Sequence, residues 1–99
     1  MLFRSEGWGQ TAAAARRAVA DMKRVTPPAV KAAGFKRLLA EGQRLATEIQ
    51  NVHDALVKKN YLAARTAQNA ATKADTTIHR EALKLGLTFC QQLLTNWPA

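Results

Sequence analysis

The sequence predicts an all-α protein, a small helical bundle built on a long antiparallel helical hairpin with an added N-terminal helix. Apolar residues recur at intervals of three and four along most of the chain, a Thr-Pro-Pro sequence separates two of these stripes, and a Lys-Lys-Asn sequence separates the next two. A chain of 99 residues has room for one small domain. We therefore expect a flexible arm over residues 1–10 and a single helical domain over residues 11–99.

The first expected helix spans residues 11–25. Gly7, Trp8 and Gly9 precede it without helical periodicity, whereas Thr11 is a suitable N-cap. Within the helix, apolar side chains share one face and cations lie opposite. The apolar face comprises Ala15, Ala18, Val19, Met22 and Val25, and the basic face Arg16, Arg17, Lys23 and Arg24. The segment is therefore a basic amphipathic helix.

The first arm of the hairpin is expected over about residues 28–58, within a hairpin that spans residues 27–97. Pro27 disfavours helical geometry at Thr26, which can cap the helix that follows, and proline is tolerated in a first turn. The main apolar stripe of this arm is Leu38, Leu45, Ile49, Val52 and Leu56. Gly34 and Gly42 either permit a close helix crossing or, at Gly42, mark a bend.

The second arm is expected over about residues 61–96, after a tight turn at Lys58, Lys59 and Asn60, where Asn60 is suited to a left-handed conformation. Small residues on one face of this arm allow two helix axes to approach closely. They are Ala63, Ala64, Ala67, Ala70, Ala71 and Ala74. Residues 75–77 can cap a new helix, so that one long helix and two shorter ones are both compatible with the sequence.

The C-terminal segment carries more apolar surface than one neighbouring helix can cover. Two apolar stripes lie side by side over residues 78–97. Either the helix over residues 11–25 covers the second stripe or another chain does, and we favour an interface with a protein partner or with a second copy of the chain. The expected interface residues are Leu83, Leu87, Phe89, Cys90, Leu94 and Trp97.

The net charge of +8 and the isoelectric point near 10.4 favour an anionic partner. A sequence-nonspecific contact with RNA, DNA or another polyanion would use the cations of the N-terminal half, with Trp8 or Phe3 available for base stacking. These cations are Arg16, Arg17, Lys23, Arg24, Lys31, Lys36 and Arg37. Two alternatives remain open: the basic face simply contacts water, or the N-terminal segment is a mitochondrial presequence.

No motif in the sequence indicates catalysis. His53 and His79 lack the spacing of a metal site, Cys90 lies in an apolar stripe, and the glycines form no phosphate-binding loop. We expect no enzyme activity, cofactor or metal, and no membrane span. A single cysteine favours an intracellular, reducing compartment. We expect the cytoplasm, with the mitochondrion as the alternative.

The turn between the two arms of the hairpin carries a local resemblance. The run from Asp54 to Ala64 resembles the hairpin turn of tetratricopeptide-type repeats and is similar to a turn in the helical domain of the steroid receptor RNA activator family. No second copy of the repeat is present, so the resemblance assigns no family. The sequence thus predicts a non-enzymatic helical interaction or adaptor module, a small basic subunit of an assembly or a homo-oligomer, with nucleic-acid binding as the alternative.

Overall fold

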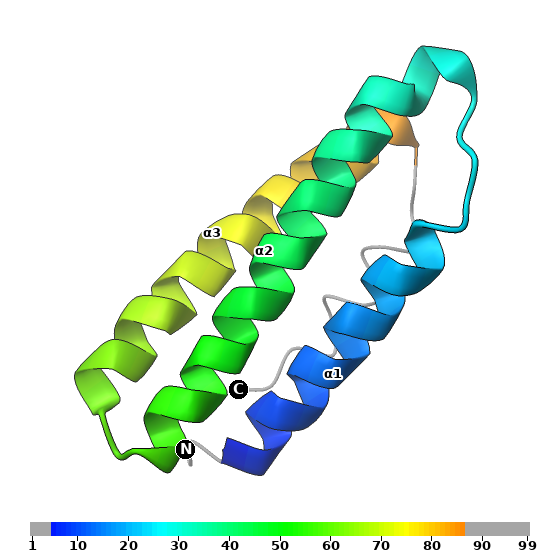
Figure 1. The fold of residues 1–99 in the computed structure, drawn as a ribbon. Helices are drawn as coiled ribbons and strands as arrows, with labels where there is room; N and C mark the ends of the chain where they lie inside the picture. The colour runs from blue at the N-terminus through cyan, green and yellow to red at the C-terminus, as the bar shows by residue number, and fades with distance from the viewer. Residues whose placement is uncertain (1–4, 87–99) are drawn as a thin grey trace.

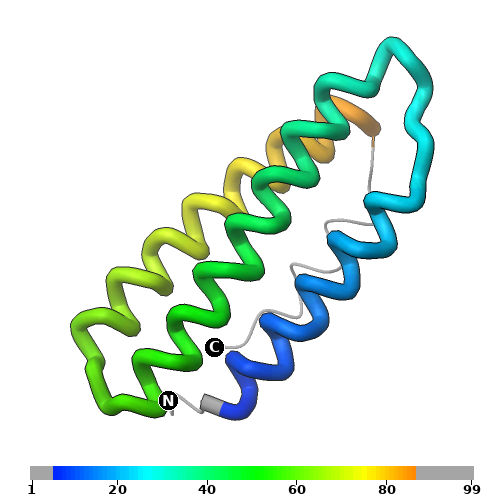
Figure 2. Tube along the Cα trace, in the orientation of Figure 1, coloured from blue at the N-terminus to red at the C-terminus, as the bar shows by residue number. Residues whose placement is uncertain are grey.

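The computed structural model describes residues 5–86, except for the side chain of Ser5. Its elements are α1 (Ser5–Met22), a 3-10 turn η1 (Ala29–Lys31), α2 (Ala32–Val57) and α3 (Tyr61–Leu85). The predicted all-α class and the hairpin, formed by α2 and α3, are confirmed. The helix α2 lies in the middle and packs against both α1 and α3, in a molecule of 45 × 21 × 19 Å (Figures 1 and 2).

The helix α1 begins at Ser5, six residues before the predicted start at Thr11. Residues 5–10 are therefore helical, where the sequence predicted a flexible arm. The physical reason is Trp8, which is 1% exposed and shares the core with Ala12, one helical turn later. Burial of an indole side chain is worth several times the helix penalty of the two flanking glycines. Trp8 is consequently a core residue, and the prediction that it stacks on nucleic-acid bases is wrong.

The helix α2 begins at Ala32, four residues later than predicted. Thr26 caps no helix, because Pro28 is still extended and η1 intervenes, with the Lys31 amide donating to the Pro28 carbonyl at 2.9 Å. No side-chain hydrogen bond caps α2. The helix α1 also ends earlier than predicted, at Met22, so that Val25 is exposed. The prolines thus produce a longer connection than a single helix cap would.

The turn between α2 and α3 occurs at the predicted residues, with different roles for two of them. Lys59, and not Asn60, adopts the left-handed conformation, at φ 58°. Asn60 is instead the N-cap of α3, since its Oδ1 accepts a hydrogen bond from the Ala63 amide at 3.1 Å. The backbone N–H of Asn60 in turn donates to the Ala55 carbonyl at 2.8 Å. Local hydrogen bonds therefore fix the shape of this turn.

Residues 61–85 form one helix. Thr76 and Thr77 do not start a second helix, because their hydroxyls donate to the carbonyls of Thr72 and Lys73 within α3. The helix ends at Leu85, and not near residue 96 as predicted. Gly86 takes φ 74°, and its amide donates to the Leu83 carbonyl. The side chains of this helix that enter the core are Ala64, Ala67, Ala71, Ala74, Ile78, Ala82 and Leu85.

Gly34 and Gly42 allow close helix contacts on two different sides of α2. A β-carbon at Gly34 would lie 2.9 Å from Leu85 Cδ2 of α3, and one at Gly42 would lie 3.0 Å from Val19 Cγ2 of α1. Both distances are shorter than ordinary carbon–carbon contact. Of the two interpretations of these glycines, the structure therefore supports close packing.

Candidate anion interface

A groove of about 320 Å³ runs between α1 and α2, and two of the predicted cations line it. Arg16 and Lys23 come from the α1 side, and their separation of seven residues corresponds to about 10 Å along a helix axis. Gln43 and Thr47 of α2 lie across from them, one helical turn apart. Val19 and Ala46 complete the lining. The groove thus combines positive charge with the side-chain amide of Gln43, which can donate to phosphate oxygens, whereas the Thr47 hydroxyl donates to the Gln43 carbonyl at 3.0 Å.

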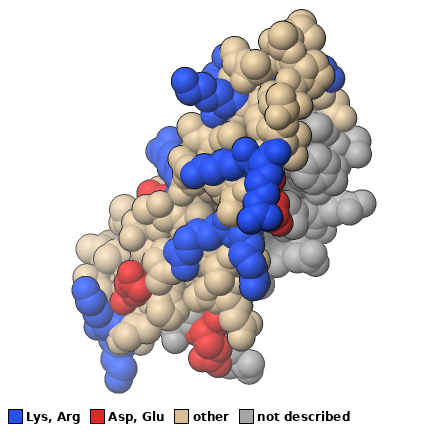
Figure 3. All heavy atoms as spheres, turned by 45° about the vertical axis from the view of Figure 1, so that its right-hand side comes forward, with Lys and Arg blue, Asp and Glu red and all other residues tan. Residues whose placement is uncertain are grey.

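All seven predicted cations are exposed, but they do not form a single contact surface. Lys31 Nζ donates to the Leu85 carbonyl at 3.0 Å, and Arg37 Nε lies 3.9 Å from Glu81 Oε2, so both reach toward α3. Within residues 5–86, no side-chain hydrogen bond or ion pair restrains the four cations Arg17, Lys23, Arg24 and Lys36. Lysine and arginine side chains gather in the middle of the face that α1 presents (Figure 3).

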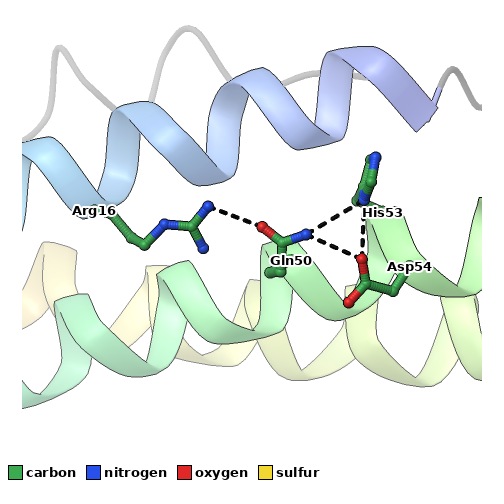
Figure 4. A network of polar contacts seen from close by, with 4 residues as sticks. All are labelled: Arg16, Gln50, His53 and Asp54. Carbon is green, nitrogen blue, oxygen red and sulfur yellow. Dashed lines mark hydrogen bonds and ion pairs between the residues drawn. The ribbon is translucent and has the colours of Figure 1, made fainter.

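A polar network extends the groove along α1 and α2 (Figure 4). Arg16 Nη2 donates to Gln50 Oε1 at 2.9 Å, and Gln50 Nε2 donates to Asp54 Oδ1 at 3.0 Å. His53 Nδ1 lies 3.0 Å from Asp54 Oδ1 and 3.3 Å from Gln50 Nε2. The direct partner of Arg16 is therefore a neutral amide, and no carboxylate in the described part of the chain forms an ion pair with either groove cation.

His53 and Asp54 have a structural explanation. The imidazole lies against the backbone of α1, where a β-carbon at Gly9 would be 3.0 Å from His53 Cδ2. Hydrogen bonds from His53, and then from Gln50, hold the pKa of the exposed Asp54 carboxyl below its usual value. Asp54 is thus ionised at neutral pH and held by its own helix. This cluster orients Gln50, which in turn positions Arg16.

The sequence identified the cations of the groove and missed its neutral side chains. Gln43, Thr47 and Gln50 recur at intervals of four and three, which places them on one face of α2, and this spacing was the available signal. The sequence does not show which face of α2 packs against α1. It therefore does not show that these polar side chains lie opposite the cations of α1. The groove therefore emerges only once the two helices are packed.

The predicted protein interface falls mostly outside the described residues. Leu83 is 57% exposed near the end of α3. The other five residues, Leu87, Phe89, Cys90, Leu94 and Trp97, lie beyond residue 86.

Two further properties concern the described residues alone. Between residues 5 and 86, no three His, Cys, Asp or Glu side chains come together as metal ligands would. None of the helices in this range has the length and hydrophobicity needed to cross a membrane.

No protein-family model matches the chain, and neither a curated protein nor a solved structure shows significant similarity to it.

Proposed function

We propose that this chain is a non-enzymatic, helical nucleic-acid-binding module that contacts phosphates through the α1–α2 groove without sequence specificity. The observation that carries the proposal is that Arg16 and Lys23 line one side of the groove while Gln43 and Thr47 line the other. Neither cation is neutralised by a carboxylate among the described residues, so both charges are available to an anion.

The charge around the groove supports the same partner. Between residues 16 and 44 the chain has eight basic residues and two acidic ones, Asp21 and Glu41. The basic residues are Arg16, Arg17, Lys23, Arg24, Lys31, Lys36, Arg37 and Arg44. Such an excess attracts a polyanion from a distance and favours nonspecific phosphate contact over base recognition. With Trp8 buried, base stacking on that residue contributes nothing to this mode of binding.

The test is fluorescence anisotropy with labelled single-stranded RNA, single-stranded DNA and duplex DNA between 50 and 200 mM salt, conditions that weaken phosphate contacts progressively. Arg16→Gln combined with Lys23→Gln removes the groove charges. Lys73→Gln combined with Arg80→Gln removes two exposed charges of α3 that do not line the α1–α2 groove, and is the matched control.

We expect binding at 50 mM salt. On duplex DNA the slope of log K against log salt is negative, and its magnitude should fall by about 1.8 for the groove variant, about 0.9 per lost contact. The control variant should retain most of the wild-type slope. Absence of binding at 50 mM salt would overturn the proposal. Equal losses in the two variants would assign binding to diffuse charge, and not to the groove.

A further inference from the structure

The turn between α2 and α3 exposes three large apolar side chains within six residues. Val57 is 60% exposed, Tyr61 64% and Leu62 80%. Their neighbours Leu56 and Ala64 supply the core contacts here, so these three residues are not required to close the hairpin. Single exposed apolar residues are ordinary in folded proteins, whereas a cluster at one end of a molecule marks a contact surface. We call residues 57–62 the hairpin tip.

The hairpin tip is also basic. Lys58 and Lys59 lie between the apolar residues, and Arg65 follows one helical turn into α3, all three exposed. Over residues 54–66 the only acidic residue is Asp54, whose carboxylate already accepts hydrogen bonds within α2. The tip therefore combines apolar side chains with an excess of positive charge.

The position and the composition of the hairpin tip favour a fluid anionic surface as its partner. The tip lies at the opposite end of the molecule from the connection between α1 and α2 (Figure 1), and the hydrogen bonds of Asn60 keep it folded. The groove beside it, lined by Asn60, Leu62 and Ala63, also contains Glu48, whose carboxylate disfavours any anionic group within the groove itself. An exposed end that combines apolar and basic side chains is suited to a fluid anionic surface, in which apolar side chains enter and cations remain at the level of the headgroups.

We propose that the hairpin tip binds peripherally to anionic phospholipid membranes. Val57, Tyr61 and Leu62 enter the interface, while Lys58, Lys59 and Arg65 contact lipid phosphates. Tyrosine is enriched at this depth, where its ring is buried and its hydroxyl stays hydrated. This contact is independent of nucleic-acid binding, because it uses none of the residues that line the α1–α2 groove.

The test is cosedimentation of the full chain with phosphatidylcholine vesicles that either lack or contain phosphatidylglycerol, at 0.15 M salt. Lys58→Gln combined with Lys59→Gln removes the tip lysines, and Lys73→Gln combined with Arg80→Gln is again the charge-matched control. Leu62→Ser tests insertion, and Val30→Ser, at a side chain 90% exposed at the other end, is its control. Circular dichroism confirms that each variant is folded.

We expect binding to the anionic vesicles only. The double lysine variant should bind about 25-fold more weakly, since about 1 kcal/mol for each cation near an anionic surface corresponds to about fivefold. Leu62→Ser should weaken binding about tenfold, and both control variants should bind within about twofold of wild type. Failure to bind anionic vesicles would overturn the proposal. A protein would then be the remaining partner for the tip. Equal losses in tip and control variants would overturn it as well.

Discussion

Alanine at Gly42 should destabilise the chain, although alanine is the better helix former. The new β-carbon would lie 3.0 Å from Val19 Cγ2 of α1. Ordinary contact between carbon atoms is about 3.5–4.0 Å, so α1 or the Val19 side chain has to move by a few tenths of an ångström. Rotation of Val19 offers little relief, because a β-branched side chain in a helix has one strongly preferred rotamer.

The expected magnitude is a difference between two opposing effects. Replacing glycine by alanine in a helix interior is worth about 1 kcal/mol. Overpacking a close contact costs typically about 1–3 kcal/mol. Gly42→Ala should therefore lower the free energy of unfolding by up to about 2 kcal/mol in the wild-type chain. With Val19→Ala the clash is removed, and the same substitution should then stabilise by about 1 kcal/mol.

The assay is urea unfolding followed by circular dichroism for the wild type, the two single variants and the double variant. The expected coupling between the two positions is about 1–3 kcal/mol. Gly7→Ala is a control, because its β-carbon would meet no atom within 4 Å and should be neutral or stabilising. If Gly42→Ala stabilises the chain equally with valine or alanine at position 19, the close contact between α1 and α2 is refuted.

Three further substitutions test other parts of the fold by the same unfolding measurement. Trp8→Ala should cost about 3–5 kcal/mol because the side chain is 1% exposed, whereas an unchanged midpoint would mean that residues 5–10 do not pack. Asn60→Ala should cost about 1 kcal/mol through loss of the α3 cap, and no change would contradict that hydrogen bond. Burial raises the pKa of the Asp75 carboxyl, so the folded chain binds this proton more tightly than the unfolded chain, and the residue opposes folding once pH rises above its ordinary value. Asp75→Ala should therefore stabilise by about 1 kcal/mol at pH 7 and by less near pH 3, and an equal gain at both would exclude the carboxylate as the cause.

The helices were predictable from the sequence because their information is periodic and local. The apolar stripe from Leu38 to Leu56 and the alanines from Ala64 to Ala74 each specify one face of one helix. The ends of the helices depend on tertiary contacts. Nothing near Trp8 in the sequence shows that its indole has a place in the core, and so residues 5–10 resembled a loose arm.

The binding surface was only partly predictable for a related reason. The exposure of a cation can be predicted from its position on a polar face. The residue that it contacts on another helix cannot be predicted in this way. Arg16 and Arg37 are similar in sequence context, yet one contacts Gln50 of α2 and the other faces Glu81 of α3. The predicted basic surface therefore divides into cations that line a groove, cations that contact α3, and exposed cations such as Arg17, Arg24 and Lys36 that do neither.

The α1–α2 groove and the hairpin tip are far enough apart for their electrostatic contributions to be measured separately. Arg16 contacts Gln50, and from Gln50 to Lys58 the helix α2 rises by about 12 Å, whereas the Debye length at 0.15 M salt is about 8 Å. Removing charge at one surface should leave the potential at the other nearly unchanged. The groove variant should thus lose nucleic acid and keep vesicles, and the tip variant should do the reverse. If each variant weakens both ligands equally, the net charge of the whole molecule governs binding, and neither surface is a site.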